Sequence, residues 1–172
     1  MYEIPGELLL EFGDENGNIL PPQHKYGGKR PVIAAFFDDT QDTDMMRPSS
    51  KLSNMVIKHR HLGKLKDGAL GVTLLFATQN YTSSSGGLLK SIRGNLTHML
   101  VFRNKNQKEI DKIGEEVGGE IPIEEFNSVY NQAVQGPHDF LFIDLHRKPN
   151  HPSMFRRNFN EWILPGQSLP AQ

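Results

Sequence analysis

A run of apolar residues that ends in two carboxylates constrains this chain more than any other feature. The segment VIAAFFDD, residues 32–39, places Asp38 and Asp39 directly after an unbroken apolar run. A strand of a parallel sheet is covered on both faces, so it reads as a continuous apolar run and not as an alternating one. Ligands of open α/β sheets bind beyond the carboxyl ends of the strands. The segment therefore predicts a buried parallel strand that presents a carboxylate pair to a ligand.

Three further segments have the same strand-like form. They are GVTLLFATQ (71–79), THMLVFR (97–103) and DFLFIDLH (139–146). Helical patterns lie between them: KLSNMVIKHRHL behind the capping pair Ser49-Ser50, NQKEIDKIGEEV stopped by Gly118-Gly119, and IPIEEFNSVYNQAV. Strands that alternate with helices predict an α/β fold. We expect all four strands in one parallel sheet flanked by helices, with Asp39 and Gln79 at the same edge.

Turn formers divide the chain into three parts. Residues 1–30 contain one short apolar run among many turn-forming residues, and they predict a weak strand and a long loop. Residues 31–165 hold the predicted α/β domain, and residues 166–172 form a loose tail. The composition, 37% hydrophobic and 23% charged, is typical of a globular chain and excludes disorder of the whole.

Charge and residue usage exclude several classes of function. The net charge is −1, so any contact with DNA must come from a local basic patch or from several copies in a ring. There is no cysteine, which excludes disulfides and thiolate metal sites. The N-terminal sequence MYEIPGELLLEFGDENG is acidic where a secretory signal is basic, and no stretch approaches the ~20 apolar residues of a membrane span. We expect a protein that is made and kept inside a cell, without a membrane segment.

The end of the second strand-like segment adds a polar amide to the carboxylate pair. Thr78-Gln79-Asn80 follows the apolar run TLLFA, and an amide in this place can hydrogen-bond a γ-phosphate or an attacking water without adding negative charge. Each strand end also has a plainer interpretation. DDTQDTD can be a solvated turn with Asp as a helix cap, and Gln79 can be a strand-end cap that faces solvent.

No phosphate-binding loop is present in this sequence. SSSGGLLKSIRGN contains Gly86, Gly87, Lys90 and Ser91, but it lacks the spacing GxxxxGK[ST], and the segment Tyr26-Gly27-Gly28-Lys29 fails for the same reason. Arg93 in the same segment offers a guanidinium to a phosphate, in cis or across a subunit boundary, where it would neutralise transition-state charge. A surface arginine in a loop is the alternative.

A small basic group follows the first predicted helix. Lys58, His59, Arg60 and His61 are consecutive and could contact nucleic acid phosphates or a neighbouring active site. The two histidines could also bind a metal, although the sequence shows no third ligand at a recognisable spacing. A solvated helix end, whose cations favour the helix dipole, is the structural alternative.

Taken together and in this order, these motifs resemble the genome-packaging ATPases of large and polinton-like eukaryotic DNA viruses and virophages, in the FtsK/HerA-type branch of P-loop ATPases. The matching pieces are VIAAFFDD as Walker B, KHRHLG, LLFATQNYTSSSGGLLKSIRGN as sensor glutamine plus arginine, and PHDFLFIDLH with PSMFRRNF. They cover roughly residues 31–165. The resemblance implies part of a RecA-like (ASCE) parallel sheet flanked by helices.

The resemblance also implies roles and partners. Asp38 would be the Mg²⁺ acid, Asp39 the catalytic carboxylate, Gln79 the γ-phosphate sensor and Arg93 a candidate arginine finger, so that Asp38, Asp39 and Gln79 would contact ATP and Mg²⁺. The implied partners are double-stranded DNA, further copies of the chain in a homo-oligomeric ring, a Walker A-bearing segment or chain, and a viral capsid portal or vertex. The implied location is the host cytoplasm or a viral factory, with the virion as a second location.

The absence of a Walker A sequence separates three hypotheses. The first is a truncated or split part of an ATP-driven DNA translocase, inactive alone, and the intact carboxylates and Gln79 favour it. The second is a non-catalytic, degenerate ATPase module for ring assembly, which the missing phosphate loop favours. The third is a metal-dependent hydrolase or nuclease, in which Asp38, Asp39, His59 and His61 would bind metal directly.

Overall fold

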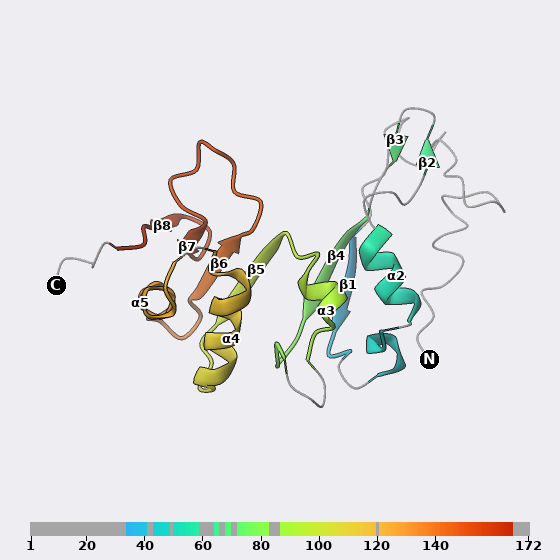
Figure 1. The fold of residues 1–172 in the computed structure, drawn as a ribbon, viewed down its shortest axis with the longest axis horizontal. Coiled ribbons are helices and arrows are strands. Elements are labelled where there is room, and N and C mark those ends of the chain that lie inside the picture. The colour runs from blue at the N-terminus through green and yellow to red at the C-terminus, as the bar shows by residue number, and fades with distance from the viewer. Residues whose placement is uncertain are drawn as a thin grey trace. The chain divides into compact units, whose positions relative to one another are not determined.

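The structure, a computed structural model, describes residues 34–40, 43–48, 50–58, 64–65, 68–69, 72–82, 87–119 and 121–166. The chain divides into two compact units (Figure 1). The first comprises residues 1–79 and 85–92, and the second comprises residues 80–84 and 93–172. The strand and loop predicted for residues 1–30, and most of the predicted tail, lie outside the described residues. No helix in the described ranges is long and apolar enough to cross a membrane.

A parallel pair of strands organises the first unit. Strand β1 (Ala34–Asp38) pairs with β4 (Thr73–Ala77), in a register that runs from Ala34 opposite Thr73 to Asp38 opposite Ala77. This confirms the predicted parallel pairing of the first two strand-like segments. The short strands β2 (Lys64–Leu65) and β3 (Gly68–Ala69) form a separate antiparallel pair.

The prediction that β1 and β4 are buried on both faces is wrong for the described residues. Phe37 is buried and stacks on Phe76, with ring centroids 5.0 Å apart, but Phe36 is 65% exposed and Leu75 is 48% exposed. Phe36 lies opposite Leu75 in the register, so the face that carries both is exposed, and no third strand pairs with β1 or β4 among the described residues. The apolar residues expected to lie beneath a second layer of helices are therefore exposed.

Helix α2 (Lys51–Lys58) confirms the helix predicted behind Ser49-Ser50 as far as Lys58. The Ser53 backbone N–H donates to Ser50 Oγ at 3.1 Å, which satisfies one of the free amides of the first turn. Leu52 and Val56 are buried, as their helical spacing predicts. A hydrogen bond of 2.9 Å between Ser53 Oγ and Ser91 Oγ joins α2 to the short helix α3 (Lys90–Arg93). A 3-10 turn, η1 (Asp44–Met46), precedes α2.

The second unit is a four-stranded antiparallel sheet with two helices. Its strands, in spatial order, are β5 (His98–Phe102), β6 (Phe140–Asp144), β7 (Phe155–Arg157) and β8 (Glu161–Ile163). The prediction that THMLVFR and DFLFIDLH join a parallel sheet is wrong, because β5 and β6 pair antiparallel, with His98 opposite Asp144. Two helices separate these strands, and each reverses the chain. Parallel strands are usually joined by a crossover through one helix, whereas two helices lie between β5 and β6.

Those two helices, α4 (Gln107–Val117) and α5 (Ile123–Ala133), match both predicted helical segments. Helix α4 ends at the predicted Gly118-Gly119, where Gly119 has a φ of 74°. Gly114 allows the helices to approach closely, because a Cβ there would lie 2.6 Å from both Ile123 Cδ1 and Phe126 Cδ1. The most deeply buried side chains of this core include Ile110, Phe126, Leu141, Ile143 and Phe155.

The Asp139 carboxylate holds the start of β6 through hydrogen bonds. Its Oδ2 accepts hydrogen bonds of 2.7 Å from the Gly136 backbone N–H and from Arg157, and its Oδ1 accepts one of 3.0 Å from Asn158 Nδ2. These bonds, with that from Asn158 the strongest contributor, lower the pKa of Asp139 from 3.8 to about 2. The charged carboxylate thus stabilises the ends of the strands on either side of it.

We expect this stabilisation to be present above the carboxyl's ordinary pKa and to fade as the pH falls through about 2, because the folded-state pKa is the lower one. Urea midpoints measured at pH 6, 3.5 and 2 test this. Wild type should exceed Asp139→Asn at pH 6, and the difference should shrink across pH 4 to 2 and nearly vanish at the lowest pH. A difference that is constant with pH would mean that the carboxylate charge contributes nothing.

Candidate functional site

The carboxyl ends of β1 and β4 bring three of the predicted residues to one edge of the parallel pair. Asp38 is the last residue of β1 and lies opposite Ala77, the last residue of β4. Asp39 follows β1 and Thr78-Gln79 follows β4, so the carboxylate pair and the amide lie at the same end, as their sequence positions predict. Asp38, Asp39 and Gln79 are all exposed there.

Strand β1 ends at Asp38, and the backbone turns at Asp39. Asp39 has a φ of 48°, in the left-handed region that non-glycine residues seldom occupy. Aspartate tolerates this region better than most residues, because its short side chain can hydrogen-bond locally. Such a conformation costs on the order of 1 kcal/mol and is found both in tight turns and at functional sites. Asp38 therefore still belongs to the extended strand, whereas the chain changes direction at Asp39.

Among the described residues, Asp38, Asp39 and Gln79 have no side-chain hydrogen bond or ion pair, whereas the nearby Asp44 pairs with Arg47 at 2.7 Å. Two adjacent carboxylates without a cationic partner attract a cation. No three His, Asp or Glu side chains in the described ranges form a group that could hold a metal by themselves.

Arg93, the candidate finger, makes contacts within the second unit. Its Nε donates to Glu116 Oε2 at 2.9 Å, and its Nη2 donates to Glu116 Oε1 at 3.3 Å. The same guanidinium lies 5.3 Å from the centre of the Tyr81 ring. The Tyr81 hydroxyl donates to the same Glu116 oxygen at 2.8 Å. A bidentate arginine–carboxylate pair has a defined geometry. To contact a phosphate, Arg93 would have to exchange this carboxylate for it.

Glu109 holds the backbone at Tyr81 and Thr82, and no sequence pattern predicts this contact. This buried carboxylate accepts hydrogen bonds from the backbone N–H groups of Tyr81 and Thr82 at 2.8 and 3.0 Å, and from Thr82 Oγ1 at 3.1 Å. Burial, followed by the bond to Glu116, raises the pKa of the Tyr81 hydroxyl, so Tyr81 remains a donor. Helix α4 thus fixes the backbone two residues beyond Gln79.

The basic group after the first helix is described only in part. Lys58 is exposed at the end of α2. His59, Arg60 and His61 lie outside the described residues, and with them the histidine pair of the metal-hydrolase alternative.

Comparison with known proteins adds no assignment. No family model, no curated protein and no solved structure matches this chain.

Proposed function

We propose that this chain is part of an ATP-hydrolysing DNA translocase that packages viral double-stranded DNA into capsids. The observation that supports the proposal is the register of β1 and β4, which brings Asp38, Asp39 and Gln79 to one edge. Among the described residues, no cation pairs with the two carboxylates there. Asp38 would hold Mg²⁺ through water. Asp39 would orient the attacking water and take its proton as the oxygen bonds to the γ-phosphorus and the bond to the β-phosphate oxygen breaks. Gln79 would hydrogen-bond the γ-phosphate.

The phosphate cradle would come from a separate Walker A-bearing segment or chain. Carboxylates alone repel a nucleotide, and the backbone amides and lysine of a phosphate loop are its principal partners. Two features support a completing segment. The outer edge of β4 has no strand partner in the described part of the chain, and Phe36 and Leu75 are exposed on the sheet. Copies in a ring, double-stranded DNA and a capsid portal or vertex are the further partners proposed.

The metal role of Asp38 can be tested on the chain itself with Mn²⁺ in place of Mg²⁺. We expect added Mn²⁺ to broaden the backbone amide NMR signals at Asp39 and at Gln79 most strongly. Asp38→Asn should weaken this effect roughly tenfold, because an interaction with a charged group is lost. Asp44→Asn, which removes an acid already paired with Arg47, should leave it unchanged.

Two outcomes would contradict the metal role. The first is broadening centred elsewhere in the chain, and the second is broadening that Asp38→Asn does not alter. Either result would favour the non-catalytic assembly module.

A further inference from the structure

On one face of the antiparallel sheet of the second unit, no helix or strand among the described residues forms a covering layer. Alternate residues of a strand point to opposite faces, and one set, including Val101, Leu141, Ile143 and Phe155, is buried. The other set forms what we call the open face, together with Phe159 from the turn between β7 and β8. Its apolar members are Leu100, Phe102, Phe140, Phe142, Phe159 and Trp162. Phe102 is 55% exposed and Phe159 is 57% exposed.

The rings of the open face form a continuous set. Phe159 lies between Phe140 and Phe142, with ring centroids 5.1 and 5.7 Å away, and both contacts are edge to face. Phe102 continues the set at 5.2 Å from Phe140. Mutual packing holds these rings while part of each remains accessible. Flat rings held in this way can stack on another flat group with little loss of side-chain freedom.

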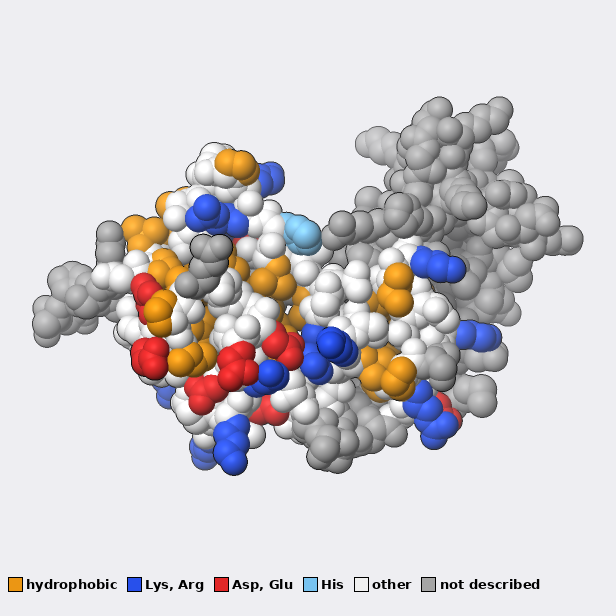
Figure 2. Space-filling model, viewed as in Figure 1, with side chains coloured by type: hydrophobic (Ala, Val, Ile, Leu, Met, Phe, Trp, Pro, Cys, Tyr) orange, Lys and Arg blue, Asp and Glu red, His pale blue; other side chains and the backbone are white. Residues whose placement is uncertain are grey.

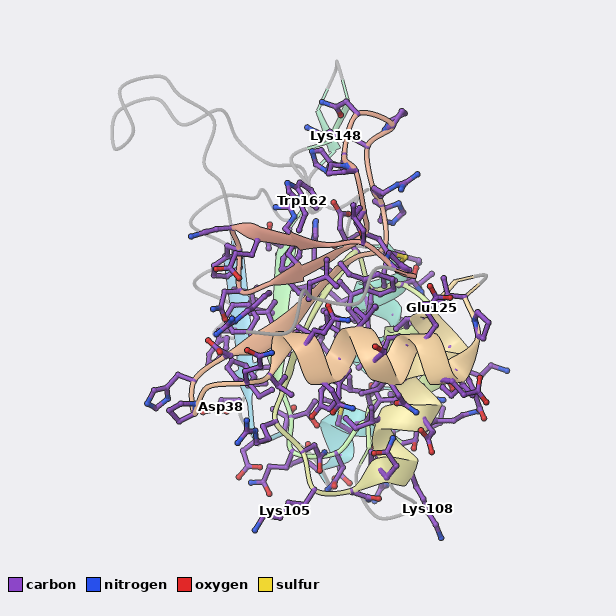
Figure 3. All side chains as sticks on the ribbon, turned by 90° about the vertical axis from the view of Figure 1, so that its left-hand side faces the viewer. Asp38, Lys105, Lys108, Glu125, Lys148 and Trp162 are labelled. Atoms are coloured by element: carbon purple, nitrogen blue, oxygen red, sulfur yellow. The ribbon has the colours of Figure 1, made fainter. Side chains whose placement is uncertain are left out.

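The cationic side chain of Arg156 lies among these rings, and it has no carboxylate partner in the described part of the chain. The Arg156 guanidinium lies 3.8 Å above the Trp162 ring centre and 5.2 Å from that of Phe142. Its Nε is buried and has no hydrogen-bond partner among the described residues. One terminal nitrogen lies 3.4 Å from the Phe159 carbonyl, and the other lies 3.4 Å from His151 Nδ1. In the loop between β6 and β7, Arg147 and Lys148 are exposed and have no carboxylate partner in the described part of the chain. Figure 3 shows Lys148 at the outer end of this loop, above Trp162.

Negative charge is concentrated away from the open face. Its one carboxylate, Asp144, is buried, accepts a hydrogen bond from the His146 backbone N–H at 3.1 Å, and lies within 3.7 Å of His98 and 3.5 Å of His151. Acidic side chains gather instead over helices α4 and α5 (Figure 2), among them Glu115 and Glu124. The open face thus combines accessible rings, unpaired cations and little negative charge.

We propose that the open face binds single-stranded nucleic acid. Bases would stack on Phe102 and Phe159, next to the stacked Arg156–Trp162 pair, and phosphates would pair with the cations of the β6–β7 loop and with Arg156. Stacking platforms flanked by cations bind single strands in this way, since every unpaired base offers a flat face. A duplex hides those faces within its own stack. A purely apolar protein partner would cover the exposed cations Arg147 and Lys148 without offering them an anionic acceptor. The proposal does not depend on nucleotide chemistry at the ends of β1 and β4.

Trp162 is the only tryptophan in the sequence and reports directly on this face. The full chain is titrated with 20-nucleotide oligo-dT, 20-nucleotide oligo-rU and a 20-base-pair DNA duplex, and Trp162 fluorescence is followed. We expect both single strands to quench it, with an affinity that falls as salt rises. The duplex should bind roughly tenfold more weakly or not at all. The two single-stranded arms compare DNA with RNA.

Phe159→Ala should weaken single-strand binding roughly tenfold, the loss of one stacked base. Phe36→Ala is the matched control, because it removes an equally exposed phenylalanine from the first unit and should change nothing. Circular dichroism verifies that both variants fold. Arg156→Lys keeps the charge but loses the flat guanidinium, and it should weaken binding less than Arg156→Ala.

Three results would overturn the proposal. The duplex could bind as tightly as the single strands, which would indicate phosphate contacts alone. Folded Phe159→Ala could bind as well as wild type. Sedimentation could show a dimer that Phe159→Ala dissociates, without quenching by either oligonucleotide, and the open face would then be an interface between copies of the chain.

Discussion

Replacing Asp39 with asparagine is expected to lower ATP hydrolysis by about 10²–10⁴-fold in a complex of this chain with a Walker A-bearing segment. Asparagine keeps the size of the side chain but cannot take a proton from the attacking water. The structure leaves Asp39 exposed and without a hydrogen bond or ion pair among the described residues, so the substitution removes no contact that folding uses. The loss should therefore fall on turnover and far less on the affinity for ATP.

Steady-state phosphate release, together with nucleotide affinity from a separate titration, measures both quantities. Asp44→Asn is the matched control, since it removes a carboxylate already paired with Arg47, and turnover should stay within about twofold. The isolated chain should hydrolyse ATP negligibly, with or without Asp39. Robust turnover by the isolated chain that Asp39→Ala abolishes would instead show that the chain supplies its own phosphate cradle.

Local signals account for the elements that the sequence predicts well. Helix α2 begins where Ser50 can cap it, and α4 ends where Gly119 can adopt a positive φ, so each boundary depends on residues within one turn. The apolar runs likewise mark β1, β4, β5 and β6. Strand direction is different, because it depends on how many helices intervene and on which edge the chain returns to. The pattern predicts both helices between β5 and β6, and the strands on either side of them pair antiparallel.

Some residues of the candidate site can likewise be predicted from local sequence, and others cannot. Asp38, Asp39 and Gln79 could be grouped from sequence because each stands at the end of an apolar run, and parallel pairing then brings the ends together. Glu109 could not be found, because it bonds to Tyr81 from 28 positions away and lies on a helix that also carries several exposed acids. For Arg93, the residue can be predicted but its contact cannot. Its charge is visible in the sequence, but its pairing with Glu116 is not.

Phe126→Ala is expected to destabilise the second unit by about 3–5 kcal/mol. Phe126 is 1% exposed, its ring meets Phe155 edge to face with centroids 6.1 Å apart, and it packs at Gly114, where the two helices approach most closely. Truncation removes the transfer free energy of a whole ring and leaves a cavity. Phe155 and the α4 backbone surround that cavity, and a sheet and a helix cannot easily collapse into it.

Urea unfolding followed by Trp162 fluorescence measures this loss, because Trp162 lies in β8 of the same unit. At a slope of about 2 kcal/mol per molar urea, a loss of 4 kcal/mol lowers the midpoint by roughly 2 M. Phe159→Ala is the control: it deletes the same ring from an exposed turn of the same unit, and the loss of its edge-to-face contacts should cost about 1 kcal/mol, well below the loss at Phe126. Similar midpoints for the two variants would mean that α4, α5 and the sheet do not form the cooperative core described above.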